Sequence, residues 1–357
     1  MNQLELDDLL KLAVDAGASD LHLGGELAPK VRMSEYLFDV PGIGKIDSAN
    51  VKKMLDPLLS EWQRERFDKD RELTGSYSVR GVGRFRFTLF QEHGAVAAVF
   101  RYIPFEIPGL DSLGLPPIVE KLSEIPRGLV LVTGPARSGR TTTLASMVDQ
   151  INSTRACHIV TIEDPIEFLH LSKSAKVDQR EVGSDATGFG NALRHVLKQD
   201  CDVIMVGEMR ELDTISAALT AAETGHLVLA SLHSQDAPDA INRTIEAFPP
   251  YQQQQARGRL ARILQAVLTQ QLLPNADGTG WAIACEVLVG SPVVKNLIRQ
   301  GRIEQLGEVI AQGSDREMIS MDHSIEQLVR TGAVSQAVAF TSSSDPEGLK
   351  RMLVGGD

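Results

Sequence analysis

Apolar and polar positions follow different patterns near the start of the chain and in the rest of it. Apolar residues from Leu6 to Ala13 recur at helical spacing, and Asp20 to Leu23 alternates like a half-buried strand. A charged helix is predicted over 49–68. Three later stretches, which together predict a β-meander, lie at 75–79, 84–90 and 95–102. These patterns predict a small α+β domain over residues 1–102.

Prolines and glycines then concentrate in 103–117, which predicts a linker. Beyond it, short apolar runs alternate with amphipathic helices, as in a mostly parallel sheet covered by helices. The four buried strands expected are 129–132, 158–162, 203–206 and 227–230. Ser291 and Pro292 predict a helix start, and the polar end at 341–357 is expected to fray. The predicted fold class is α/β, with domains at 1–102, 118–290 and 291–357.

The stretch 128–143 carries the strongest chemical signal. It places Gly134, Gly139 and Thr141 as the phosphate-binding loop G-x-x-x-x-G-K-[ST] requires, between a predicted strand and a predicted helix. Such a loop turns backbone N–H groups towards phosphate oxygens, and its hydroxyl residue binds Mg²⁺. Arg140 stands where the motif has lysine, and its longer, forked guanidinium is not equivalent. A glycine-rich turn without a ligand is the simpler alternative.

Polar side chains follow the other predicted strands at the points where they end. Glu163 and Asp164 follow one strand, Glu208 the next, and His233 the last. Because parallel strands end at the same edge of a sheet, these groups are predicted to meet the phosphate loop. Glu163 or Glu208 can then orient the water that attacks a phosphate. The alternatives are a helix cap for Asp164 and ordinary structural roles for the histidines.

Composition and charge exclude several classes of protein. The formal net charge of −11 disfavours a nucleic-acid translocase, which usually carries a basic surface. The 3 cysteines are far apart in the sequence and predict neither a disulfide framework nor a metal site. The acidic start has no signal-peptide pattern, and no apolar run is long enough to span a membrane. We therefore expect no direct membrane insertion.

Six further stretches of the sequence carry motifs: Ala18 to Leu23, Pro126 to Gly134, Thr161 to Phe168, Val206 to Arg210, Ala221 to His226 and Val294 to Arg299. Together they resemble the motifs of secretion and pilus ATPases, and most of all those of the type IV pilus retraction ATPases. The resemblance implies a PAS-like N-terminal domain, a RecA-like P-loop ATPase domain and C-terminal helices. It also implies a cytoplasmic homohexamer beneath the inner-membrane pilus platform protein, with ATP and Mg²⁺ as ligands and a paralogous pilus ATPase as a further partner.

The resemblance assigns roles to individual residues. The implied catalytic residues are Glu163, Glu208, His233, Arg86 and Arg101. Thr141 and Glu208 are the implied Mg²⁺ ligands. The implied nucleotide-binding residues are Gly134, Ala136, Arg137, Ser138, Gly139, Arg140, Thr141, Thr142, Asp164, His226 and Arg84. The three N-terminal arginines are expected to face the nucleotide from the N-terminal domain of a subunit, and strand alternation puts Arg84 and Arg86 on one face.

Departures from the family pattern gather in the phosphate loop. Ala136 and Arg137 replace the usual Thr-Gly, and Arg140 replaces the lysine. Two functions are compatible with this combination of motifs and departures. The first is a hexameric motor that hydrolyses ATP and retracts a pilus, which the otherwise complete set of catalytic residues favours. The alternative is a paralogue that binds nucleotide, hydrolyses it weakly or not at all, and serves as a structural or regulatory subunit of the motor.

Overall fold

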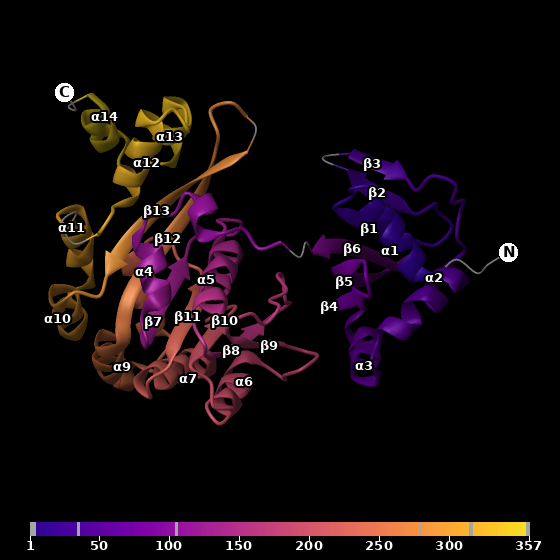
Figure 1. Ribbon diagram of the computed structural model, residues 1–357, viewed down its shortest axis with the longest axis horizontal. Helices are drawn as coiled ribbons and strands as arrows, with labels where there is room; N and C mark the ends of the chain where they lie inside the picture. The colour runs from indigo at the N-terminus through magenta and orange to yellow at the C-terminus, as the bar shows by residue number, and fades with distance from the viewer. Residues whose placement is uncertain (1–4, 34–35, 104–105, 279, 314–316, 355–357) are drawn as a thin grey trace. The chain divides into compact units, whose positions relative to one another are not determined.

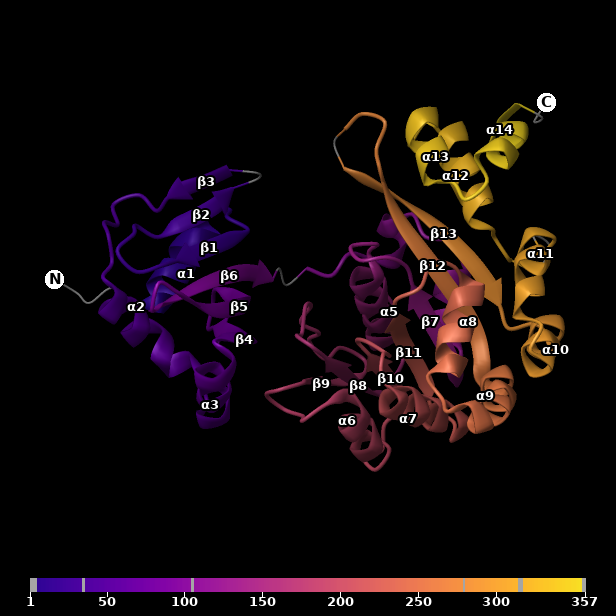
Figure 2. The same cartoon turned by 180° about the vertical axis from the view of Figure 1, so that it is seen from behind.

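The computed structural model describes residues 5–33, 36–103, 106–278, 280–313 and 317–354 (Figure 1; seen from behind in Figure 2). Residues 1–4 at the start of the predicted N-terminal domain, residues 104 and 105 of the predicted linker and residues 355–357 at the end of the predicted helical region lie outside these ranges. The chain divides into two units, the first built from Met1–Glu106, Asp164–Leu169 and Glu181–Asp185 and the second from the remainder.

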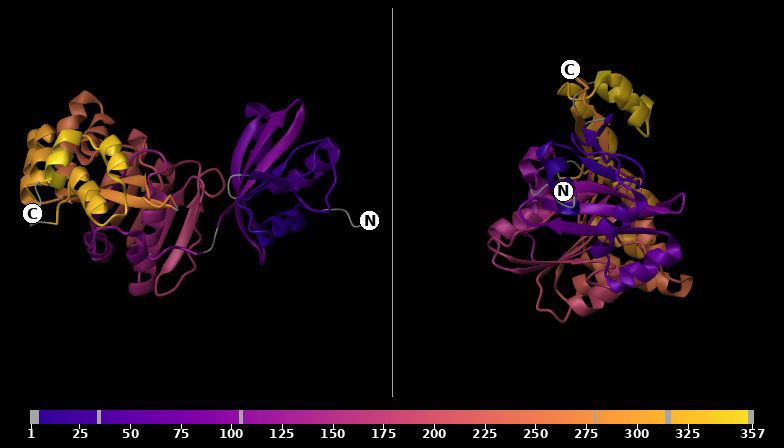
Figure 3. Two further views of the ribbon diagram at one scale, coloured as in Figure 1. Left: turned by 90° about the horizontal axis from the view of Figure 1, so that it is seen from above. Right: turned by 90° about the vertical axis from the view of Figure 1, so that its right-hand side faces the viewer.

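The first unit is a 6-stranded antiparallel sheet in the order β3-β2-β1-β6-β5-β4. Its strands are β1 (Asp20–Leu23), β2 (Lys30–Met33), β3 (Tyr36–Asp39), β4 (Glu72–Val79), β5 (Gly83–Glu92) and β6 (Ala95–Ile103). Helix α1 (Leu6–Asp15) packs against this sheet (Figure 3). Phe85 and Phe87 of β5 enter the core, whereas Arg84 and Arg86 lie on the other face, which confirms the predicted alternation.

One predicted helix of this unit is two. The pattern over 49–68 gives α2 (Ser48–Leu55), the short turn η1 (Asp56–Leu58) and α3 (Glu61–Asp70). The prediction of one continuous helix was wrong because Pro57 lacks a backbone N–H and disrupts the helical ladder. Ser60 then starts a new helix through a capping box with Gln63, in which each side chain binds the other residue's backbone N–H.

The second unit contains a 7-stranded sheet in the order β13-β12-β7-β11-β10-β8-β9. Its strands are β7 (Gly128–Thr133), β8 (His158–Glu163), β9 (Lys176–Glu181), β10 (Val203–Val206), β11 (Leu227–Leu232), β12 (Leu264–Pro274) and β13 (Trp281–Val289). The four predicted strands are confirmed as β7, β8, β10 and β11, which are parallel neighbours. Their carboxyl ends therefore share one edge of the sheet.

Helices cover both faces of this sheet. Figure 1 shows α4 in front of β7, and Figure 2 shows α8 in front of β12. The helices up to residue 263 are α4 (Ile118–Glu124), α5 (Arg140–Thr154), α6 (Phe189–Val196), α7 (Leu212–Glu223), α8 (Ala237–Glu246) and α9 (Pro250–Ile263). Apolar residues of α5, such as Met147 and Ile151, are fully buried with Val130 and Leu229 of the sheet. This packing fixes the start of α5 at the end of β7.

The last part of the chain is helical, as predicted from residue 291. It comprises α10 (Pro292–Gln300), α11 (Leu306–Ala311), α12 (Met321–Arg330), α13 (Gln336–Ser342) and α14 (Pro346–Val354). Ser291 caps α10 by accepting a hydrogen bond from the backbone N–H of Val294. The expectation that 341–357 frays was wrong for the described residues, because α14 buries Leu349 among the neighbouring helices. No helix of the described residues is long and apolar enough to cross a membrane.

Candidate functional site

The phosphate loop connects β7 to α5 through an unusual backbone. Gly134 and Gly139 have φ angles of 141° and 88°, in the region that favours glycine. A Cβ atom on Gly134 would lie 2.3 Å from the carbonyl oxygen of Gln270, so the close approach of β12 also requires glycine. Arg137 has a φ of 65°, a backbone conformation that is unfavourable for any residue with a Cβ atom, so glycine suits this position better than arginine does.

The loop holds a polar group that is suited to a phosphate. Ser138 is 2 % exposed, and its Oγ has no hydrogen-bond partner among the described residues. A buried hydroxyl without a partner is costly, and a phosphate oxygen would satisfy it. Within the described ranges no side chain caps the start of α5, which follows directly after Gly139, and the helix dipole favours negative charge at this end. The residues present therefore fit a bound phosphate group.

Arg140, the first residue of α5, reaches across to the end of β11. Its Nη1 donates to the carbonyl oxygen of Leu232 at 3.1 Å, and its Nη2 lies 3.1 Å from Nε2 of His233. Because a guanidinium can only donate, Nε2 of His233 accepts this bond and the imidazole proton sits on Nδ1. Nε2 of His233 is also 3.7 Å from Oε1 of Glu208. The first residue of α5 and the residues that follow β10 and β11 are thus together, as predicted.

Burial and nearby positive charge both lower the pKa of His233 and so favour its neutral form. Partial burial, followed by the nearby charge of Arg140, lowers the pKa of His233 below its usual value, although Glu208 opposes this. Arg210 and Arg243 add to the lowering. A neutral imidazole can accept the bond from Arg140, whereas a protonated one would repel it.

Backbone bonds hold the strand ends in register around the cluster. The N–H of Gly207 donates to Ile162 at 2.8 Å, and the N–H of Met209 donates to Ser231 at 2.8 Å. The hydroxyl of Ser231 donates to the carbonyl oxygen of Gly207. The ends of β8, β10 and β11 are therefore tied to one another at the edge that carries Glu208 and His233.

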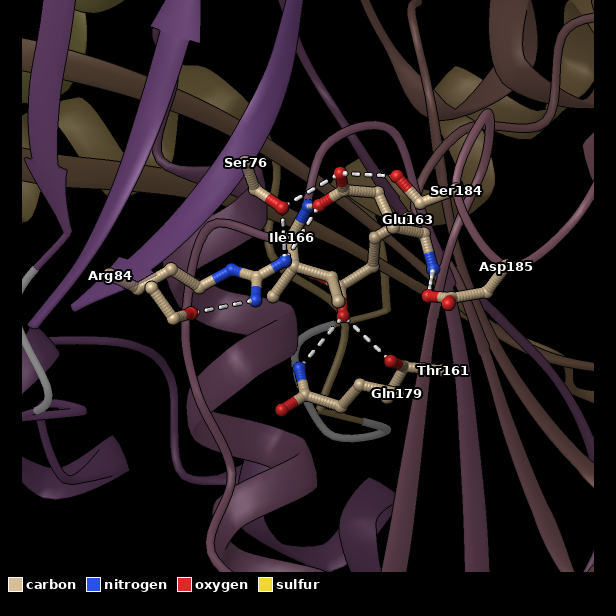
Figure 4. Close-up of polar contacts among 10 residues, drawn as sticks. Ser76, Arg84, Thr161, Glu163, Ile166, Gln179, Ser184 and Asp185 are labelled. Atoms are coloured by element: carbon tan, nitrogen blue, oxygen red, sulfur yellow. Dashed lines mark hydrogen bonds and ion pairs between the residues drawn. The ribbon is translucent and has the colours of Figure 1, made fainter. Parts of the chain in front are cut away.

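Glu163, the last residue of β8, is almost completely buried at 4 % exposure. Its Oε1 accepts hydrogen bonds from Oγ1 of Thr161 at 2.6 Å and from Nε2 of Gln179 at 3.1 Å (Figure 4). The sequence predicted Glu163 at this edge but gave no sign of Gln179, which lies on β9. Asp164, the next residue, is exposed.

The structure does not bring His226 to the phosphate loop within this chain. His226 directly precedes β11, at the amino end of the strand whose carboxyl end carries His233. Six strand residues at ~3.3 Å each separate the two ends by roughly 20 Å. His226 instead contacts the end of α7, with Nδ1 2.9 Å from the carbonyl oxygen of Ala221. Its predicted contact with nucleotide stays a prediction.

The N-terminal arginines pair with carboxylates of the first unit, one of which, Glu181, is the last residue of β9 but belongs to this unit. Nη2 of Arg84 lies 2.9 Å from Oε2 of the buried Glu181, which also accepts a bond from Ser76 at 2.8 Å (Figure 4). Arg86 pairs with Glu167 at 3.2 Å. Arg101 pairs with the buried Asp20 at 2.8 Å, but its own side chain is 58 % exposed. Their predicted role towards a nucleotide stays a prediction.

The remaining predicted loop residues differ in exposure. Ala136, Arg137 and Thr141 are exposed, and Thr142 is half-buried. The described residues contain no cluster of three or more histidines, cysteines or carboxylates able to hold a metal ion. A magnesium ion needs no such cluster when one hydroxyl, one carboxylate, phosphate oxygens and water surround it. The hydroxyl of Thr141 and the carboxylate of Glu208 are of that chemical type.

A parallel sheet with a phosphate loop after its first strand and acidic residues at the ends of the next ones defines a P-loop ATPase. The chain belongs to the Type II/IV secretion system protein family, whose match covers residues 109–344.

Individual relatives are similar over nearly the whole chain. The type IV pilus retraction ATPase PilT of Pseudomonas aeruginosa is 40 % identical over 96 % of this chain and 99 % of its own length. A twitching motility protein of Neisseria gonorrhoeae is 41 % identical over 85 % of this chain and 82 % of its own. The pilus ATPase PilU of Pseudomonas aeruginosa is 35 % identical over 98 % and 91 %.

Solved structures agree with this assignment. The crystal structure of the pilus retraction motor PilT with bound ADP has a TM-score of 0.90 and 41 % identity, covering 98 % of this chain and all of its own. The ATPase DotB of Legionella pneumophila has a TM-score of 0.85 at 22 % identity, which shows a shared fold. The predicted fold class and family are confirmed.

Proposed function

We propose that this chain is an ATP-driven motor of the type IV pilus that hydrolyses ATP to ADP and phosphate and retracts the pilus. The observation that carries the proposal is the cluster of Arg140, His233 and Glu208, together with the buried hydroxyl of Ser138, two residues before Arg140 in the sequence, which has no hydrogen-bond partner in the described part of the chain. Relatives named as a pilus retraction ATPase and a twitching motility protein support it. They favour the motor over a paralogue that does not hydrolyse nucleotide.

The phosphates would be held by the loop 134–139 and by the start of α5. Arg140 would supply the cation for their oxygens, and Ala136, Arg137 and Ser138 of the loop and Thr142 of α5 would complete the binding site. Thr141 and Glu208 would hold Mg²⁺, which supplies further positive charge to the phosphate oxygens when bound. This arrangement leaves the loop's backbone to do most of the binding.

Two side chains at the strand ends would act on the reacting water and phosphate. Glu163 would orient the attacking water and accept its proton, and Glu208 would assist from the end of β10. His233, whose pKa is lowered by burial and by Arg140 and which is bonded to that arginine, would respond to the γ-phosphate through it. Asp164 and His226 are also proposed to contact the nucleotide, on the basis of the family resemblance alone.

We propose a homohexamer in which Arg86 and Arg101 contribute to the transition state at a neighbouring subunit's nucleotide, and Arg84 contributes to nucleotide binding. The exposed guanidinium of Arg101 is compatible with this role. The ring would work in the cytoplasm beneath the inner-membrane pilus platform protein, with a paralogous ATPase as a further partner. It would not bind nucleic acid, in keeping with the net charge of −11.

We also retain the proposed division into an N-terminal domain at 1–102, a linker at 103–117, an ATPase domain at 118–290 and a helical region at 291–357. The boundary between the two units, after Glu106, falls inside the proposed linker and supports it. The assembly is tested by the molar mass of the purified chain in light scattering with and without Mg-ADP.

The motor is tested by removing the gene from its own host and restoring it on a plasmid. We expect loss of surface motility with pili that remain extended, and recovery with the wild-type gene. Glu208→Ala should fail to restore motility at equal protein abundance on an immunoblot. Motility restored by Glu208→Ala, or retraction unaffected by the deletion, would contradict the proposal.

A further inference from the structure

The carboxylate of Glu163 is held by two donors on a single oxygen. Oγ1 of Thr161 at 2.6 Å and Nε2 of Gln179 at 3.1 Å both donate to Oε1 (Figure 4). Thr161 lies on the same strand, two residues earlier, whereas Gln179 reaches over from β9. Two bonds from different directions fix the rotation of a carboxylate, which one bond alone does not.

The orientation of the Gln179 amide is itself determined by the structure. Its Oε1 accepts a hydrogen bond from the backbone N–H of His170 at 2.8 Å. Since only the oxygen of the amide can accept, the nitrogen must face the opposite way, towards Glu163. Gln179 is therefore a donor to Glu163 rather than an acceptor from it.

The segment that orients Gln179 is anchored to the helix of the phosphate loop. Asn152, on α5 and fully buried, donates through Nδ2 to the carbonyl oxygen of Leu171 at 2.8 Å. Its Oδ1 accepts from the backbone N–H of Lys173 at 3.0 Å. A continuous set of hydrogen bonds and covalent links thus runs from α5 through His170 and Gln179 to Glu163.

We propose that Gln179 is a positioning residue for ATP hydrolysis, which aims the carboxylate of Glu163 at the attacking water. The inference rests on the proposed function, because it concerns the same reaction. Gln179 does not touch the nucleotide in this role. It sets the direction of the group that does the chemistry, and it ties that direction to α5, whose start holds the phosphates.

The first test is Gln179→Leu, which keeps the approximate size of the side chain and removes the donor. We expect kcat to fall by about 10- to 100-fold, the range expected for a displaced catalytic group. The affinity for a fluorescent ADP analogue should stay within about twofold, since the phosphate loop is unchanged. Asp178→Asn is the matched control, because Asp178 is the neighbouring residue on β9, points to the opposite face and pairs with His158 instead.

The second test is Gln179→Glu, which separates positioning from a purely structural role. The new side chain still accepts from His170 but presents a carboxylate to Glu163. Two facing carboxylates raise the apparent pKa of the pair, so the acidic limb of the pH profile of kcat should move upward by about one unit or more. Thr161→Val, which removes the other donor to Oε1, should also lower kcat and keeps the test informative if a Gln179 variant fails to fold.

The proposal is overturned if Gln179→Leu and Thr161→Val hydrolyse ATP at the wild-type rate, or if Gln179→Glu folds and leaves the pH profile unmoved. These results differ from failure of the proposed function itself. If the proposed function itself fails, the wild-type chain releases no phosphate above the Glu208→Ala background, and the proposed role of Gln179 is overturned together with that function.

Discussion

Nη2 of Arg140 lies 3.1 Å from Nε2 of His233, so the arginine that replaces the phosphate-binding lysine is bound to the end of β11. A second bond to the carbonyl oxygen of Leu232, at 3.1 Å, holds the same guanidinium. A lysine ammonium has no planar fork and would not make both bonds in this geometry. The arginine is therefore held in place by the sheet edge as well as being available to phosphate, and this sets how the loop should respond to mutation.

Arg140→Lys should raise turnover. The substitution frees the cation from Leu232 and His233, and a hydrogen bond of ~1 kcal/mol that no longer competes with phosphate corresponds to about fivefold in affinity or rate. Steady-state phosphate release measures this. Arg155→Lys, at the other end of α5, is the control, since Arg155 also donates to backbone carbonyls but lies outside the site. Lower turnover in Arg140→Lys would mean that the loop has adapted to arginine.

Arg137→Gly should stabilise the protein. Arg137 has a φ of 65°, a backbone conformation that costs a non-glycine residue about 1–2 kcal/mol. Glycine removes this cost but gains entropy in the unfolded chain, so we expect a net gain of ~0.5–1 kcal/mol in the free energy of unfolding by urea. Ala136→Gly is the control and should destabilise, because Ala136 has no positive φ. Equal losses in both variants would refute the strain at Arg137.

Glu286 should make stability depend on pH. Burial raises the pKa of this carboxyl to about 7, although the backbone N–H groups of Ala237 and Met321, at the starts of α8 and α12, favour its charged form. The native state keeps the proton up to about pH 7, whereas the unfolded chain loses it near 4.5. The contribution to stability is therefore complete below pH 4.5 and is lost as the pH rises to 7.

This loss amounts to about 3 kcal/mol, and Glu286→Gln should abolish it. The variant should then be more stable than the wild type at pH 8 and should show a flatter dependence on pH between 5 and 8. Urea unfolding at each pH measures both quantities. A wild-type chain as stable at pH 8 as at pH 5, with no difference in Glu286→Gln, would show that burial does not hold this proton.

The sequence predicted the parts of the site that depend on regular patterns. Buried apolar runs identified β7, β8, β10 and β11. The common edge of parallel strands brought Glu208 and His233 to Arg140 and put Glu163 at the end of a neighbouring strand. The hairpin of β12 and β13 was missed because it extends the sheet beyond the alternating strands and helices. The backbone of Gln270 on that hairpin, together with the φ of 141° at Gly134, requires glycine at position 134.

Other parts of the site had no sequence pattern to predict them. Gln179 lies on the largely polar edge strand β9, where the sequence has no apolar periodicity. Its orientation depends on the backbone N–H of His170, nine residues earlier, and a sequence does not show which backbone group a side chain meets. Arg140 binds the carbonyl oxygen of Leu232, a group that every residue has. Every residue except proline offers the same backbone donor and acceptor, so contacts with backbone groups cannot be predicted from residue types. Such contacts determine the orientation of the side chains at this edge.

Phosphate release by the purified wild-type chain with Mg-ATP tests the central claim most directly, that the strand ends and the phosphate loop form one hydrolytic pocket despite Arg140. We expect steady release of phosphate by the wild type, and release at the level of a protein-free blank by Glu208→Ala. A wild-type rate no higher than that of Glu208→Ala, in protein shown by circular dichroism to be folded, would contradict the account.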